Sequence, residues 1–84
     1  MIYTVTWSQR ALAKLAQIWL DASDRNAVTA ASYEIDNILR DDPDLVGRPR
    51  YDTVRGFSYP PLGVEFEVIE ADRTVIEINV WHIP

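Results

Sequence analysis

The sequence contains no cysteine, which excludes disulfide bonds, a thiolate nucleophile and a cysteine-based zinc site. It has one histidine, no phosphate-cradling glycine loop and no apolar run near the roughly 20 residues that a transmembrane helix needs. The first residues lack the basic start and apolar core of a signal peptide. We therefore expect a cytoplasmic protein with no membrane span, metal or cofactor.

Basic residues are few, with 8 Lys and Arg against 13 Asp and Glu, a net charge of −5. Proteins that bind nucleic acid broadly gain most of their affinity from cations that neutralise phosphates. We therefore expect no direct nucleic-acid binding from net charge, although this balance still allows a local basic patch.

The chain has 84 residues, of which 48% are apolar, and this length fits one domain over 1–84. Residues 2–7 alternate between the two sides of a strand, and Ser8 is a suitable N-cap for a following helix. That helix should bury one stripe, and a second helix should run from a turn at 23–26 to about Arg40. The stripe of the first helix comprises Leu12, Leu15, Ala16 and Trp19.

The two helices are joined by a short turn and should form an antiparallel hairpin. Residues 43–61 are irregular, with a short strand expected around 51–57, and either the Tyr59-Pro60 or the Pro60-Pro61 bond could be cis. Alternation from Gly63 onward predicts a β-hairpin with one buried face. The result is an α+β fold of order β-α-α-β-β-β, in which the helical hairpin packs on one face of a small antiparallel sheet.

Strand periodicity assigns particular side chains to the open face of this sheet. We expect Ile76, Ile78 and Val80 to face the core. The open face should carry Glu65, Glu67, Glu77, Asn79 and Trp81. The glutamates are either a solvated surface or a contact for a basic partner, and Trp81 is either an interface anchor or packed on the Pro60-Pro61 turn.

A basic cluster and the single histidine are the remaining candidates for function. Arg48, Arg50 and Arg55, with Tyr51 among them, could contact a phosphate or an acidic partner, or pair with nearby aspartates. His82 could act as an acid or base, or it could pack at the rim of the core face. Arg55 and His82 are the weak catalytic candidates.

The ordered set of these patterns resembles the RelE/ParE family of bacterial toxin-antitoxin toxins, which includes plasmid stabilisation proteins. The resemblance covers nearly the whole chain. The residues that carry it are Tyr3 to Ser8, Ala11, Leu15, Ile18-Trp19, Ala27 to Ile35, Leu39, Pro43, Gly47, Arg55, Pro61 to Val68 and Ile76 to His82.

The resemblance implies a toxin silenced by a cognate antitoxin. RelE-like members cleave mRNA on the ribosome, and ParE-like members inhibit DNA gyrase. The family's ribonucleases usually carry an arginine where this chain has Gly63, often another where it has Ile83, and a catalytic residue beyond the position of Pro84. Phosphodiester cleavage needs such cations and a proton-transfer group.

These departures favour a ParE-like toxin that acts by protein binding. The alternatives are a RelE-like, ribosome-dependent endoribonuclease and a non-toxic interaction module of the same fold. The expected partners are an antitoxin and either gyrase or the ribosome. A homodimer through Trp81 and Ile83 is a further candidate assembly.

Overall fold

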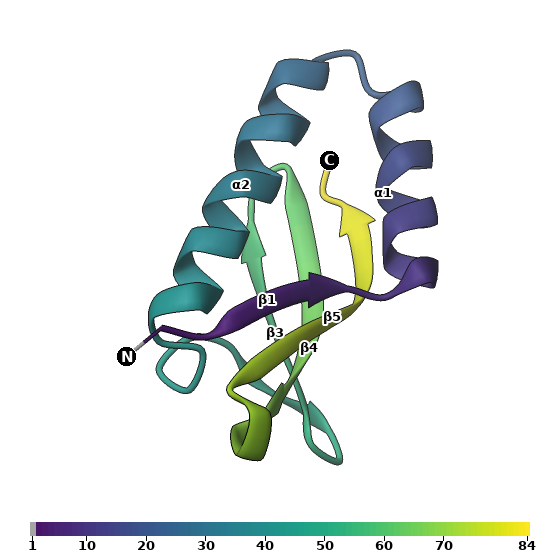
Figure 1. Cartoon of the computed structure of the whole chain (residues 1–84). Helices are drawn as coiled ribbons and strands as arrows, with labels where there is room; N and C mark the ends of the chain where they lie inside the picture. The colour runs from purple at the N-terminus through teal and green to yellow at the C-terminus, as the bar shows by residue number, and fades with distance from the viewer. Residues whose placement is uncertain (1) are drawn as a thin grey trace.

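The computed structural model describes residues 2–84, which form two long helices and one five-stranded sheet (Figure 1). Within these residues no helix is long and apolar enough to cross a membrane. The elements in chain order are β1 (Thr4–Trp7), α1 (Gln9–Asp21), α2 (Arg25–Asp41), β2 (Arg48–Tyr51), β3 (Val54–Tyr59), β4 (Leu62–Ile69), a short 3₁₀ helix (Glu70–Asp72) and β5 (Thr74–His82).

Both helices begin at side-chain caps. The Ser8 hydroxyl accepts a hydrogen bond from the backbone N–H of Ala11, and the Asp24 carboxylate accepts one from Ala27, each at 3.1 Å. These bonds satisfy amide groups that have no partner within the helix. The predicted start of the first helix and the end of the second are confirmed, because α2 stops at Asp41, just before Pro43.

The sheet order is β1-β5-β4-β3-β2, with β1 parallel to β5 and the other pairs antiparallel. The expected α+β fold is confirmed, with two differences. The sheet is mixed, and the strand expected at 51–57 is two strands separated by a turn in which Asp52 has a positive φ of 47°. Pro49 is tolerated in β2 because this strand lies at the sheet edge. The Pro60-Pro61 bond is cis.

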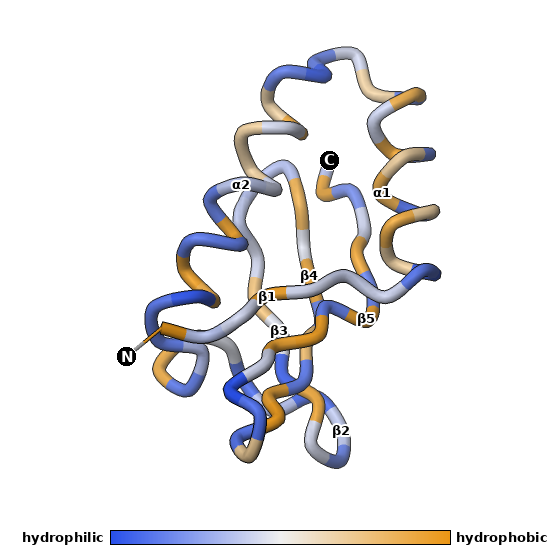
Figure 2. The backbone as a smooth tube through the Cα atoms, viewed as in Figure 1, coloured by the Kyte–Doolittle hydropathy of each residue, from blue (hydrophilic) through white to orange (hydrophobic). Residues whose placement is uncertain are grey.

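The core lies between α2 and one face of the sheet, and Figure 2 shows apolar residues recurring along β4, β5 and both helices. Burying these side chains is the main stabilising contribution. The fully buried residues of this core include Val28, Ala31, Ile35 and Leu39 from α2, Leu62, Val64 and Phe66 from β4, and Val75 and Val80 from β5.

A β-bulge changes the alternation of β5. Glu65 pairs with Asn79, whereas Phe66 pairs with Glu77, so Ile78 is an extra residue in the ladder. Partners directly opposite each other share a face, which places Val75 and Glu77 on the core face. The expectation that Glu77 lies on the open face, with Ile76 and Ile78 turned to the core, is therefore wrong.

The apolar stripe of α1 is only partly buried. Leu15 and Ile18 pack against the core, but Leu12 is 50% exposed and Trp19 is 38% exposed. We expected both of these residues to be buried. They are not, because α1 packs mainly against β5 and stands apart from α2 along much of its length (Figure 1).

Candidate functional site

The open face of the sheet is organised around Trp81. Its indole lies directly over Gly63, where an added Cβ would be 2.6 Å from Cζ2 of Trp81 and closer still to Cε2 and Nε1. The Arg50 guanidinium stands 5.6 Å from the centroid of the same ring, a cation–π arrangement. The tryptophan therefore packs on its own sheet.

Glu65 is bonded within the chain. Its carboxylate accepts from Nε of Arg50 at 3.1 Å and from Nδ2 of Asn79 at 3.3 Å, and Lys14 of α1 donates to Oδ1 of Asn79 at 3.1 Å. Glu65 is only 7% exposed, so the expectation of a solvated carboxylate is wrong here. Its charge is matched by Arg50, which leaves little for a basic partner to recognise.

Beside this network the open face has a recess of about 350 Å³. Arg48 is exposed and forms no salt bridge with any described residue, so the expected pairing of these arginines with nearby aspartates does not occur. The recess thus offers one free cation, one neutralised cation and an aromatic ring. Its lining residues are Gly47, Arg48, Arg50, Gly56, Phe57, Ser58 and Trp81.

Tyr51 and Glu67 lie on neighbouring parts of this surface. Tyr51 is 55% exposed at the end of β2, and Glu67 is half-buried and accepts a hydrogen bond from the Thr53 hydroxyl. Neither residue lines the recess. Both remain accessible to a partner.

Arg55 lies elsewhere. It pairs with Phe66, so it is on the sheet face opposite the recess, and its guanidinium donates to the backbone carbonyls of Asp44 at 2.8 Å and Gly47 at 3.3 Å. These bonds fasten the loop between α2 and β2. In this arrangement Arg55 acts as a loop clamp.

His82 is exposed near the end of the chain, in a third place. It lines a hollow together with Asp24, Pro61 and Pro84, between the start of α2 and the β3–β4 turn. In the ladder His82 pairs with Leu62, at the edge of the core face. The candidate residues therefore lie in three separate parts of the surface: Arg48 with Arg50, Arg55 alone, and His82 alone. They do not converge on one reacting group.

Glu77 is completely buried on the core face, next to Asp36 of α2. Burial, followed by the hydrogen bond and charge of Asp36, raises the pKa of Glu77 to about 11. At neutral pH it is an uncharged acid inside the protein. No group of three or more His, Cys, Asp or Glu side chains in residues 2–84 is placed to hold a metal ion.

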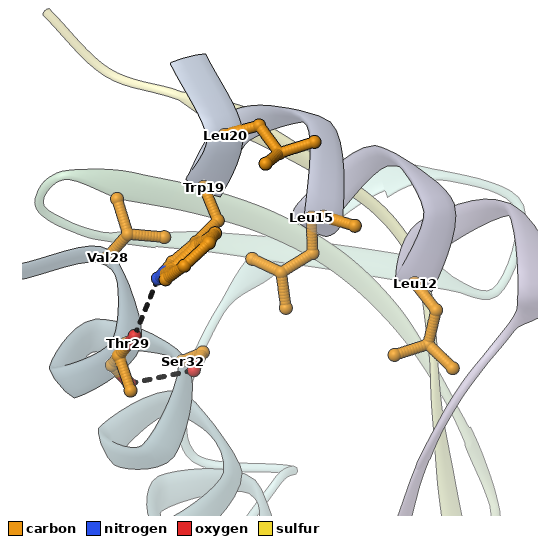
Figure 3. Close-up of a pocket in the computed structure, with 8 residues that line it drawn as sticks. Leu12, Leu15, Trp19, Leu20, Val28, Thr29 and Ser32 are labelled. Carbon is orange, nitrogen blue, oxygen red and sulfur yellow. Dashed lines mark hydrogen bonds between the residues drawn. The ribbon is translucent and has the colours of Figure 1, made fainter. Parts of the chain in front are cut away.

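The sequence interpretation missed an apolar groove of about 430 Å³ between α1 and α2 (Figure 3). In the close-up, Leu12, Leu15 and Trp19 project from α1 toward α2, and Leu20 lies along α1 at the rim of the groove. The Trp19 indole is fixed by a 3.2 Å hydrogen bond to the Thr29 hydroxyl. Leu20 could have indicated this groove in the sequence, because it adds apolar surface to α1 beside the stripe that already fills one packing face of the helix. The lining residues are Leu12, Leu15, Ala16, Trp19, Leu20, Val28, Thr29 and Ser32.

Comparison with known proteins gives matches at the level of structure. No family model and no curated protein matches the sequence. The chain is similar to a chain of the toxin-antitoxin complex RelBE2 of Mycobacterium tuberculosis, with a TM-score of 0.80, 19% identity and coverage of 98% of this chain and 99% of that one. For the chromosomal ParDE system of P. aeruginosa the TM-score is 0.76, with 16% identity and coverage of 99% and 98%. For the archaeal RelE-RelB complex of Pyrococcus horikoshii the TM-score is 0.68, with 12% identity and coverage of 98% and 96%.

These likenesses span the chain from end to end, so its fold is that of the RelE/ParE toxins. The resemblance seen in the sequence is confirmed at this level. At identities below 20% the likeness concerns the arrangement of the elements, and the side chains described above determine what this chain does with it.

Proposed function

We propose that this chain is the toxin of a toxin-antitoxin pair, that it acts by binding another protein, and that a cognate antitoxin neutralises it. The observation that carries the proposal is the apolar groove between α1 and α2, on a fold shared with chains from toxin-antitoxin complexes. Leu12, Trp19 and Leu20 leave large apolar side chains exposed along one side of it.

The groove suits the apolar side of an amphipathic helix. Helices dock in such grooves through anchor side chains spaced three or four residues apart. Fully burying a leucine side chain contributes about 1.5–3 kcal/mol, and Leu12 and Leu20 are 50% and 55% exposed. Covering them would therefore supply about half of that amount each, before the cost of association. We assign the groove to the antitoxin.

The open face is the candidate contact for the cellular target. Arg48, Arg50 and Trp81 combine cations with an aromatic ring, the residue types enriched at interaction hot spots. Glu67 and Tyr51 extend this surface. Glu65 and Glu77 are left out of it, because the first is neutralised and the second is buried.

A ribosome-dependent endoribonuclease is the second candidate, favoured by the free cation at Arg48 in a recess that could hold a phosphate. Against it, Arg55 and His82 lie away from that recess. The assay adds purified protein to ribosomes with bound mRNA. Under our proposal the wild type, Arg55→Ala and His82→Ala should all leave the mRNA uncleaved. Cleavage by the wild type that either substitution abolishes in a protein that is still folded would establish the nuclease.

Growth of a bacterial host after tight induction of the chain tests the proposal. We expect the wild type to arrest growth and Arg48→Ala with Arg50→Ala to relieve the arrest, with soluble expression confirmed for both. Gyrase supercoiling and cell-free translation assays with purified protein then separate the two targets. A soluble wild type that leaves growth, supercoiling and translation unchanged would favour a non-toxic interaction module.

The groove has its own test, in which a genomic library from the source organism is screened for clones that rescue growth. Leu20→Asp should keep the arrest and lose the rescue, because a charge in the groove opposes an apolar helix. Leu45→Asp is the matched control, since Leu45 is 81% exposed and lies outside the groove. Equal rescue of both variants would remove the groove as the antitoxin site.

A further inference from the structure

Glu77 has no role in the proposed function, yet it lies where three elements meet. Its backbone pairs with Trp7 of β1 and Phe66 of β4, and its backbone carbonyl accepts from the N–H of Ser8 at 2.9 Å. The β-bulge at Ile78 turns its side chain toward α2. The carboxyl therefore lies beneath the helix that covers the core.

Among residues 2–84, Asp36 of α2 is the one charged group that shifts the pKa of this carboxyl, and no cation does so. Asp36 faces it from α2, whereas Trp7 and Phe66 face it from the adjacent strands and do not titrate. The one salt bridge among residues 2–84 is Arg50–Glu65. Both oxygens of Glu77 are buried and lack a donor in the described part of the chain. A carboxylate in such a place would be strongly destabilised, whereas a protonated acid supplies its own donor.

Asp36 is the acceptor that this proton needs. Its carboxylate is half-buried and accepts from Nε1 of Trp7 at 3.1 Å and 3.4 Å, which holds it over the strand pair. A carboxylate has about four acceptor sites, so one indole donor leaves room for a second. Trp7 thus donates to Asp36, and Asp36 lies beside Glu77, so these side chains bring β1, α2 and β5 together.

We propose that Glu77 is a built-in neutral acid whose proton bridges to Asp36 and holds α2 against β1 and β5, so that loss of this proton loosens the helix. This protonated pair is a pH-sensitive latch inside the fold. It is independent of the proposed function, although the same helix carries Val28, Thr29 and Ser32 of the groove wall.

The direction of the effect follows from linkage. The ordinary pKa of the glutamate is 4.5, and its folded-state value is raised to about 11. The contribution of Glu77 to stability is therefore fully present below about pH 4.5 and declines as pH rises toward 11. Between pH 6 and 9, well inside that window, Glu77 alone raises the unfolding equilibrium constant about tenfold for each pH unit, because unfolding releases the proton.

The test compares wild type with Glu77→Gln in denaturant titrations from pH 6 to 9. Gln has the same shape and carries an N–H donor that does not titrate. The slope of log Kunfold against pH should be smaller by about one in Glu77→Gln, and contributions common to both proteins cancel. Glu34→Gln is the matched control, because Glu34 is exposed on α2, and it should keep the wild-type slope.

A direct reading of the wild type keeps the proposal testable if Glu77→Gln fails to fold. The ¹³C chemical shift of the Glu77 side-chain carboxyl, followed by NMR, should show the protonated form at pH 7 and change only in the alkaline range. Hydrogen exchange in α2 should become faster over the same pH range. A deprotonated Glu77 at pH 7, or equal slopes for wild type and Glu77→Gln, would overturn the latch.

Discussion

A methyl group added at Gly63 is the sharpest probe of the open face. In Gly63→Ala the new Cβ would stand 2.6 Å from Cζ2 of Trp81, where unstrained carbon atoms stay about 3.5–4.0 Å apart. The indole must therefore move by about 1 Å. Overpacking of this kind costs about 1–3 kcal/mol.

Moving the indole also disturbs Arg50, whose guanidinium stands 5.6 Å from the ring centroid. A cation–π contact at a partly exposed site contributes about 0.5–1 kcal/mol. We therefore expect Gly63→Ala to destabilise the protein by about 2–3 kcal/mol, or roughly 30- to 150-fold in the unfolding equilibrium constant. Urea denaturation followed by far-UV circular dichroism measures this change, with an m-value close to the wild type.

A double-mutant cycle separates the indole from the backbone. In a Trp81→Ala background the same Gly63→Ala change should cost less than about 1 kcal/mol, because the clashing atoms are gone. Equal costs in both backgrounds would refute the reasoning and place the strain elsewhere in β4. The cycle bears on function as well, since an arginine at position 63 would have to displace Trp81 first.

Three further changes test the supports of the fold. Arg55→Ala should cost about 2 kcal/mol and speed hydrogen exchange in the 44–47 loop, because the guanidinium bonds two backbone carbonyls there; unchanged exchange would contradict the clamp. Ser8→Ala should cost about 1 kcal/mol in a urea titration through loss of the α1 cap, whereas Ser8→Gly should cost only a few tenths. Trp7→Phe keeps an aromatic but smaller ring and removes the indole donor to Asp36, so it should cost about 1–2 kcal/mol. A melting temperature equal to that of the wild type would argue against that bond.

Local signals explain which parts of the fold could be predicted from the sequence. The caps at Ser8 and Asp24 and the stop before Pro43 depend on a few neighbouring residues, and all three lie where such residues favour them. The alternation of β4 also held, because Val64 and Phe66 face the core as expected. Each of these features is decided within about one turn or strand of the chain.

The errors arise where distant residues decide the outcome. The bulge at Ile78 depends on how β5 meets β4, and it reverses the alternation that placed Glu77 outside. The burial of Glu65 depends on Arg50, 15 positions away, curling over the same face. Strand periodicity contains neither fact. The exposure of Trp19 and the presence of the groove result from the separation of the two helices, and the apolar stripe on α1 does not determine that separation.

The pairing of β1 with β5 has a consequence for synthesis. Thr4 lies opposite Thr74, so the first strand waits for a partner that emerges from the ribosome about 70 residues later. Until then both helices lack the sheet face that they cover, and Asp36 has no Glu77 to meet. Any chain interrupted before Thr74 lacks the strand on which β1, α1 and the latch depend. The open face and the packing of both helices therefore form only after β5 has been synthesised and has left the ribosome.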